Sequence, residues 1–330
     1  MSKILNMHKY SILLVLALLL GACSESSRFR VADGAVWNTT YHISYRSERD
    51  LHDSIVAVMK QVEVSLSPFS KVSLVSRINS GEDVVTDSLF RRIFHASQTV
   101  SHNSGGLFDP TVAPLVNLWG FGYRQTGVEP SRSTVDSLLP LVGIGRCSIN
   151  SDGRVVKCHP STEFNFSAIT KGYGCDMVGE MLLRNGVEDY MVEIGGEIAV
   201  AGHSPRGSEW RIMVDAPVDC DTAVVHERLT VIEVTSCGVA TSGNYRNYRQ
   251  TAQGRVWHTV SPLTGYPAET DLLSATVKAP TCMEADAYAT ACMAMDSRAA
   301  LWMIEKVDGV EALLVTRDTI LTTSNFPTLQ

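Results

Sequence analysis

One short segment, residues 284–290, places a carboxylate and a hydroxyl where both could bind a metal ion. Asp286 and Thr290 are four residues apart, so in a helix their side chains share one face. A carboxylate, a hydroxyl and a nearby backbone carbonyl are the hard oxygen ligands that Mg²⁺ prefers. A capped or solvated helix start explains the same pattern equally well, so both interpretations stay open.

A second segment, residues 165–173, offers a site for an anion. A turn leads into a helix predicted to begin at Thr170, and Lys171 lies in its first turn. The free backbone amides of a first turn carry partial positive charge, and together with Lys171 they favour an anion such as phosphate. The alternative is an ordinary Thr170 N-cap beside a solvated lysine.

Two loops contribute aromatic and proton-transferring side chains. In residues 104–122 the glycines allow close backbone approach, and Phe108, with Trp119 and Phe121, could wall an aromatic ligand. Asp109 precedes a proline and is expected to be extended. His258 precedes a turn-rich stretch, where an exposed imidazole could transfer a proton. The alternatives are a buried aromatic loop and an inert histidine.

Helices and strands must alternate along the chain to position these residues. Antiparallel hairpins dominate the predicted strands, so the sequence indicates an α+β fold. Apolar residues at helical spacing predict helices over residues 51–66, 88–101, 133–141, 170–185, 284–295 and 298–307. Alternation predicts strands over residues 36–45, 190–202 with a double-glycine turn, 210–216, 229–236, 311–316 and 319–323.

The composition is that of a globular protein and excludes several function classes. The chain has 330 residues, of which 45% are apolar and 19% charged, and its net charge is −7. An acidic chain is poorly suited to binding nucleic acid through a basic surface, so we expect no nucleic-acid partner. The motifs of phosphate-loop NTPases, Rossmann dehydrogenases, zinc proteases and α/β-hydrolases are all absent from the sequence.

The N-terminus is typical of an exported lipoprotein. The apolar run Ile12 to Leu20 would span roughly 14 Å as a helix, about half of a bilayer core. Residues 1–22 therefore read as a signal peptide, and small residues precede Cys23 as in a bacterial lipobox. We expect Cys23 to carry the lipid, residues 23–33 to form a tether, and the protein to be held at the membrane facing the periplasm. Ordinary signal cleavage is the alternative.

Cys147 and Cys158 flank a predicted hairpin turn at Asp152-Gly153. That turn would place the two cysteines opposite each other, where an exported protein could form a disulfide. Two small buried apolar side chains are the alternative. No CxxC pair is present in the sequence, which argues against structural zinc.

Taken together and in order, the motifs resemble those of the ApbE family, FAD:protein FMN transferases that include exported bacterial lipoproteins. The resemblance covers about residues 34–323. It implies a T-fold-like α+β architecture over residues 34–330, with FAD in a cleft between two subdomains. The matching motifs are Gly-Gly-Leu-Phe-Asp-Pro-Thr with Asn-Leu-Trp-Gly-Phe-Gly, Lys-Gly-Tyr, Ile-Gly-Gly-Glu, Thr-Ser-Gly-Asn-Tyr, His-x-x-x-Pro-x-Thr-Gly-x-Pro and Ala-Asp-Ala-x-Ala-Thr.

The same resemblance implies a flavin site and a Mg²⁺ site. Mg²⁺ would be held by Asp286, Thr290 and the backbone carbonyl of Ala168, whereas Ala289 replaces a carboxylate that some members carry. Asn38, Asn165 and Ser261 also depart from the usual glycine, aspartate and aspartate. The implied flavin contacts are Trp37, Phe69, Leu107, Phe108, Asp109, Asn165, Lys171 and Val260.

The implied reaction is phosphoryl transfer from FAD to a protein. A threonine or serine hydroxyl attacks the FMN-side phosphorus and AMP leaves, with His258 as candidate base and Asp109 as a second candidate or an orienting group. The family's acceptors are exported or membrane-bound flavoprotein subunits of electron-transport complexes. Two alternatives are a metal-dependent FAD pyrophosphatase and a non-catalytic FAD-binding lipoprotein.

Overall fold

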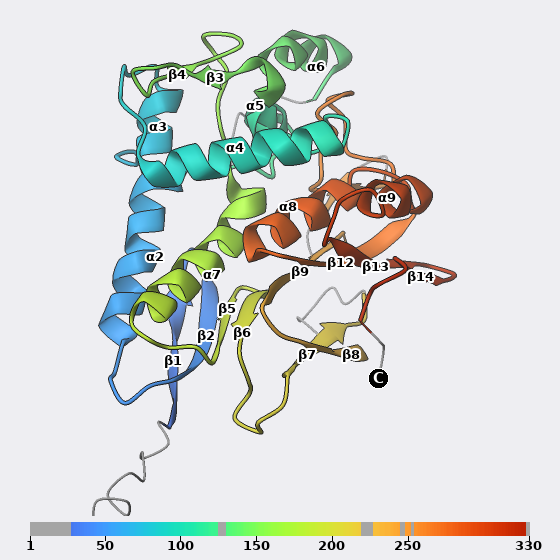
Figure 1. Cartoon of the computed structure of the whole chain (residues 1–330). Helices are drawn as coiled ribbons and strands as arrows, with labels where there is room; N and C mark the ends of the chain where they lie inside the picture. Colours follow the sequence, from blue (N-terminus) through green and yellow to red (C-terminus); the bar gives the residue numbers. More distant parts are fainter. Residues whose placement is uncertain (1–27, 125–129, 219–226, 245–247, 252–253, 328–330) are drawn as a thin grey trace, which may run out of the picture.

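Strands from both halves of the chain form one antiparallel sheet (Figure 1). The computed structural model describes residues 28–124, 130–218, 227–244, 248–251 and 254–327. Eight strands lie in the order β1-β2-β5-β6-β9-β12-β13-β14, and every neighbouring pair is antiparallel. Their bounds are β1 Phe29–Val36, β2 Thr39–Arg46, β5 Tyr190–Ile194, β6 Glu197–Ala201, β9 Cys237–Gly243, β12 Leu272–Ala279, β13 Glu311–Thr316 and β14 Ile320–Thr322.

Helices cover one face of this sheet (Figure 1). The apolar stripe of α2, with Ile55, packs with Val178 of α7 and Val192 of β5 in one buried cluster. A second cluster joins α4, α7, α8 and β12 through residues such as Phe90 and Val277. The helices are α2 His52–Leu66, α3 Leu74–Asn79, α4 Ser88–Asn103, α7 Ser167–Arg184, α8 Cys282–Cys292 and α9 Ser297–Ile304.

A hairpin of β7 Trp210–Asp215 and β8 Arg228–Val234 covers part of the other face. Because side chains alternate along a strand, Val200 of β6 contacts this hairpin while its neighbour Ala199 faces the helices. The hairpin therefore closes a small third core on the side of the sheet away from α7 and α8.

Shorter elements between α4 and α7 carry the aromatic loop. They pack as a small cluster around Leu115 and Val135, with Val260. No helix within the described ranges is long and apolar enough to cross a membrane. The elements between α4 and α7 are the 3₁₀ turns Pro110–Val112, Leu139–Leu141 and Ile144–Arg146, α5 Ala113–Leu118, α6 Arg132–Leu138, β3 Ser148–Ile149 and β4 Val155–Val156. A separate hairpin of β10 Tyr248–Thr251 and β11 Gly254–Trp257 lies between β9 and β12.

The α+β class is confirmed. The predicted helices and most of the predicted strands are present within a few residues of their predicted bounds. Two central strands, β9 and β12, and the short α3 were not predicted. The strand predicted over residues 36–45 is present as β2 from Thr39, but its predicted start is wrong, because Trp37 and Asn38 have φ of 49° and 61° and form a turn between β1 and β2. Strand β1 also begins at Phe29, inside residues 23–33 that were predicted as a tether. Residues 1–22 and Cys23 lie outside the described part of the chain.

The hairpin between Cys147 and Cys158 has a different register from the predicted one. Ser148 pairs with Val156, so the two cysteines are offset by one position. Both thiols are free, and the Cys158 amide donates to the Cys147 sulfur at 3.3 Å. The structure thus favours two free thiols, Cys147 buried and Cys158 half-buried, over a disulfide. Burial raises the pKa of Cys147 to about 12.

Candidate metal and flavin site

The three predicted metal ligands lie together where α7 packs against α8. The Thr290 hydroxyl is 3.5 Å from the Ala168 carbonyl oxygen, and Ser242 of β9 lies 3.4 Å from the same hydroxyl. One turn along both helices, the Gly172 amide donates to the Asp286 carboxylate at 3.0 Å. Asp286 is only 3% exposed, so its carboxylate can interact with groups inside the site but hardly with solvent.

Close approach of the two helices depends on Gly172. A Cβ at this position would lie 2.2 Å from the carbonyl oxygen of Cys282 and 2.8 Å from the Asp286 Cβ. Any larger residue would have to push α8 away from α7. The glycine of the Lys-Gly-Tyr motif is therefore needed for packing, independently of the neighbouring lysine.

Lys171 forms a buried charged group with two carboxylates. Its ammonium makes an ion pair with Glu197 at the start of β6, and Glu197 is 3% exposed. Burial raises the pKa of Glu197 to about 8, and the nearby Asp286 adds to this while Lys171 opposes it. Burial also raises the pKa of Asp286. Lys171 itself is held charged, because the two carboxylates outweigh its burial and raise its pKa.

Glu197 was not among the predicted site residues. Its only sequence signal is its place after a double glycine in the Ile-Gly-Gly-Glu motif. Gly195 and Gly196 have φ of 62° and 98° and form the turn between β5 and β6, which brings Glu197 beside α7. The turn lies against the Lys171 side chain, since a Cβ at Gly195 would lie 3.3 Å from the Lys171 Cδ.

The donor set suits a hard divalent cation. The described residues contain no group of three or more His, Cys, Asp or Glu side chains placed to hold a metal. A single carboxylate, a hydroxyl and a carbonyl instead match Mg²⁺, which retains waters and takes substrate phosphate oxygens. Burial raises the pKa of both carboxylates because their charged forms lose solvation, which a bound divalent cation would replace.

A cavity of about 760 Å³ opens beside this cluster. Trp37, Phe69 and Lys171 line it, together with Ser167 and Thr170. The Trp37 indole nitrogen is buried and has no hydrogen-bond partner among the described residues. A buried donor left without a partner is costly, so a ligand acceptor in the cavity would satisfy it. The cavity volume and this donor fit a dinucleotide such as FAD.

The start of α7 differs from the prediction. The helix begins at Ser167, so Thr170 is not its N-cap, and the Thr170 hydroxyl donates to the Phe166 carbonyl at 2.7 Å. Asn165 accepts from the Ser167 amide at 3.0 Å. The predicted flavin contact Asn165 thus already serves to begin α7. The Thr170 amide, expected to be free in a first turn, donates to the Phe166 carbonyl at 2.9 Å.

Asp109 holds the aromatic loop in place. Its carboxylate accepts hydrogen bonds from the amides of Thr111 and Ile144, both at 2.8 Å, and from the Thr111 hydroxyl at 2.5 Å. Burial raises its pKa, although these hydrogen bonds oppose the rise. With its oxygens engaged in this way, Asp109 is poorly placed as a catalytic base, and the geometry favours the orienting role.

The other predicted flavin contacts lie in or near packed clusters. Phe108 is 3% exposed and Val260 is 5% exposed, so their side chains serve the core and could reach a ligand only through the backbone. Leu107 packs at the edge of the main core. The half-buried His258 packs against Phe121 of the loop over residues 104–122, with ring centroids 6.4 Å apart.

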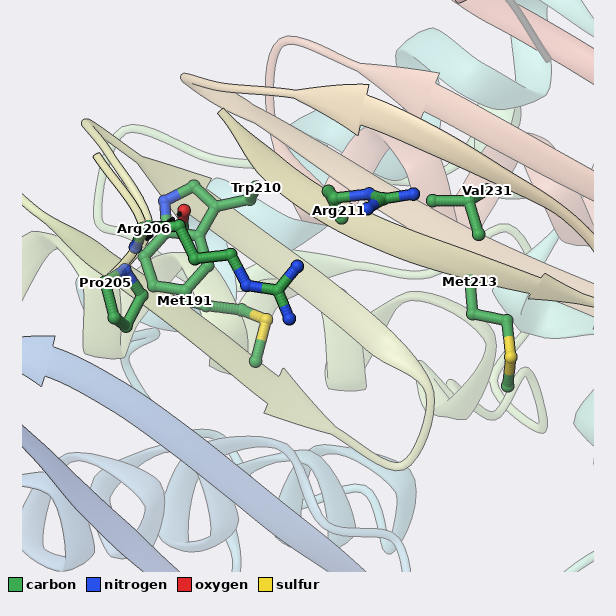
Figure 2. A pocket seen from close by; sticks show the side chains of 8 residues that line it. Met191, Pro205, Arg206, Trp210, Arg211, Met213 and Val231 are labelled. Atoms are coloured by element: carbon green, nitrogen blue, oxygen red, sulfur yellow. Dashed lines mark hydrogen bonds between the residues drawn. The ribbon is translucent and has the colours of Figure 1, made fainter. Parts of the chain in front are cut away.

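A second cavity, of about 400 Å³, lies on the β7–β8 hairpin (Figure 2). Met191, Arg206, Trp210 and Met213 line it. None of its lining residues was predicted to bind FAD or a metal, and the hairpin lies on the opposite side of the sheet from α7 and α8. The cavity beside Lys171 is therefore the better candidate for the site.

Known proteins match the chain over most of its length. Residues 37–314 match the sequence profile of the ApbE family. The FAD:protein FMN transferase of Haemophilus influenzae is 31% identical, covering 93% of this chain and 92% of that protein. The flavin transferase ApbE from Vibrio cholerae superposes with a TM-score of 0.80 at 30% identity, covering 91% of this chain and 98% of that one.

A third likeness is to the apo form of the Pseudomonas stutzeri flavinyl transferase ApbE. It has a TM-score of 0.80 at 31% identity and covers 91% of this chain and 96% of that chain. Sequence profile, overall sequence and backbone thus agree over nearly all of the described fold. The chain belongs to the ApbE family.

Proposed function

We propose that this protein is a Mg²⁺-dependent FAD:protein FMN transferase. A serine or threonine hydroxyl of an acceptor protein attacks the FMN-side phosphorus of FAD. A new phosphorus–oxygen bond forms to the acceptor, the pyrophosphate bond breaks, and AMP leaves. The observation that carries the proposal is the convergence of the Ala168 carbonyl, Asp286 and Thr290 beside the Lys171–Glu197 pair and the cavity.

The chain's own residues have separate roles in this reaction. Lys171 would neutralise negative charge that develops on the pyrophosphate, and Glu197 would hold the ammonium in place. Asp286, Thr290 and the Ala168 carbonyl would hold Mg²⁺, which when bound supplies further charge neutralisation. His258 would accept the proton of the attacking hydroxyl, and the aromatic loop, fixed by Asp109, would exclude water.

The acceptors we propose are exported or membrane-bound flavoprotein subunits of electron-transport complexes. Support comes from the sequence features at Cys23, which indicate that this chain is itself exported and lipid-anchored. Replacing Cys23 with alanine should leave the precursor unprocessed or release the protein from membranes. Unchanged processing and unchanged membrane association would contradict the lipid anchor without affecting the transferase proposal.

Mass spectrometry of a candidate acceptor tests the reaction. After incubation with the chain, FAD and Mg²⁺, we expect an acceptor peptide to gain one FMN group on a serine or threonine while AMP accumulates. Rapid release of FMN and AMP without an acceptor would instead identify a pyrophosphatase. Intact bound FAD with no product would identify a non-catalytic binding protein.

A histidine pair tests the proposed base. His258→Gln should lower the rate of FMN transfer by about 10²- to 10⁴-fold, the usual contribution of general-base catalysis. His203→Gln is the matched control, because His203 is exposed on the loop that follows β6 and was not predicted to be part of the site. Equal rates for the two variants would remove His258 from the mechanism.

A further inference from the structure

One half-buried carboxylate at the α7–α8 contact has no part in the proposed chemistry. Asp176 of α7 accepts hydrogen bonds from the amides of Cys282 and Met283, both at 2.8 Å. These amides belong to the first turn of α8. An acceptor on one helix therefore caps the helix that carries Asp286 and Thr290.

Asp176 completes a regular series of contacts between the two helices. On α7, Ala168, Gly172 and Asp176 follow one another at intervals of four residues and share a face. Their partners on α8 descend at the same interval, as expected for antiparallel helices. The contacts are Ala168 carbonyl with Thr290 hydroxyl, Gly172 amide with Asp286 carboxylate, and Asp176 carboxylate with the Cys282 and Met283 amides.

Helix α8 does not need Asp176 in order to begin. Thr281 is its own N-cap and accepts from the Glu284 amide at 3.2 Å, while the Thr281 hydroxyl donates to the Glu284 carboxylate at 2.8 Å. This pair is a local N-cap that satisfies the Glu284 amide, while the amides of Cys282 and Met283 are bound by Asp176. The contact with Asp176 therefore adds a connection between helices to a start signal that is already present.

We propose that Asp176 is a positioning residue that fixes the register of α8 against α7 and so sets the separation of the metal ligands. The inference rests on the proposed metal site. Asp176 lies eight residues from Ala168, about 12 Å along the helix axis. Because Gly172 leaves no free space between the two backbones, movement of α8 at the Asp176 end is transmitted to Asp286 and Thr290.

Metal binding by the purified chain tests the proposal without relying on turnover. Mn²⁺ is titrated into the protein and free Mn²⁺ is followed by electron paramagnetic resonance. Asp176→Asn keeps the size of the side chain but turns one acceptor into a donor that faces an amide. We expect about tenfold to a hundredfold weaker Mn²⁺ binding, the usual cost of losing a group that orients metal ligands.

Asp296→Asn is the matched control. Asp296 likewise accepts from two helix amides, those of Arg298 and Ala299 at 3.0 Å each, but it caps α9, which carries no proposed ligand. We expect this variant to lose thermal stability while binding Mn²⁺ as the parent does. Thr281→Ala removes the local cap of α8 and leaves Asp176 in place, so it should behave in the same way.

A second variant keeps the test decisive if Asp176→Asn does not fold. Asp176→Glu retains the carboxylate on a longer side chain, so α8 keeps a cap in a displaced position, and Mn²⁺ binding should again weaken. Parent-like Mn²⁺ affinity in the folded Asp176 variants would overturn the positioning role alone. No Mn²⁺ binding by the parent would overturn the proposed metal site, and the inference with it.

Discussion

The α7–α8 contact and the loop wall position their residues by different means. We call residues 104–124 and 258–266 the loop wall. At the helix contact, backbone groups bond directly to ligand side chains, as Gly172 does to Asp286 at 3.0 Å. In the loop wall, rings pack on rings, and Trp119 packs against Tyr266 with centroids 5.8 Å apart.

In the proposed reaction, the helix contact would hold the groups that bind Mg²⁺ and phosphate, whereas the loop wall would contact the flavin ring of FAD. Two helices with a hydrogen bond at each turn fix the distances between charged groups, and phosphoryl transfer depends steeply on such distances. Ring contacts tolerate small shifts. Changes at the helix contact should therefore reduce the rate of transfer, whereas changes in the loop wall should mainly raise the KM for FAD.

The largest effect is expected for Asp286→Ala, which removes the single charged ligand of the proposed set. Charge neutralisation by a metal is worth several kcal/mol in the transition state, so transfer should fall by about 10³-fold or more. Steady-state transfer rates and circular dichroism check activity and folding. Glu284→Gln on the same helix is the control, and near-normal transfer by folded Asp286→Ala, or in excess EDTA, would refute the metal site.

Gly172→Ala should produce the next largest effect, because the added Cβ would lie 2.2 Å from the Cys282 carbonyl oxygen. Overpacking of this kind costs about 1–3 kcal/mol of stability, and displacement of α8 should also lower the transfer rate at saturating FAD. Thermal unfolding and kcat are the measurements. Gly145→Ala is the control, because a Cβ added there would meet nothing within 4 Å. A variant as stable and active as the parent would show that the helices have room to separate.

Trp119→Phe probes the loop wall. It removes the hydrogen bond from the indole nitrogen to the Gly265 carbonyl at 2.8 Å, which is worth about 1 kcal/mol. We expect a several-fold higher KM for FAD with kcat little changed, measured by steady-state kinetics. Trp302→Phe on α9 is the control because Trp302 is 65% exposed. A loss confined to kcat would contradict the division between the two regions.

The smallest effect concerns the reactivity of the Cys147 thiol, which is buried. Because burial raises its pKa to about 12, almost no thiolate exists near pH 8 and alkylation should be slow. Mass spectrometry after iodoacetamide treatment should show Cys147 unmodified in the folded protein and modified in urea. If the intact protein were lighter by two hydrogens and a digest contained peptides linking Cys147 to Cys158, the disulfide prediction would be correct.

The sequence predicts local relations better than contacts between distant segments. Asp286 and Thr290 could be paired because a four-residue spacing fixes their relative position in a helix. Glu197 could not be paired with Lys171, since only the β5–β6 turn brings them together. The sequence could not decide between the two roles considered for Asp109 for the same reason: its hydrogen bond to the Ile144 amide joins segments 35 residues apart.

Strands β9 and β12 were missed for a related reason. Strand β9 is buried along four successive residues, Cys237 to Ala240, so it lacks the alternation that identifies a half-buried strand. Its sequence, rich in Gly, Ser and Thr, reads as a loop unless its neighbours in the sheet are known. Prediction from pattern alone therefore finds strands with alternating burial, or strands joined by a recognisable turn as β5 and β6 are, more readily than a continuously buried strand such as β9.

The length of strand β1 limits the distance between the FAD site and the membrane to which the chain would be anchored. It begins at Phe29 and ends at Val36, next to Trp37 in the cavity wall. An eight-residue strand is about 25 Å long, and the six residues from a lipidated Cys23 could add at most about 20 Å. With the anchor as proposed, FAD would be held within about 45 Å of the bilayer surface, and only acceptor hydroxyls presented inside that layer could be modified.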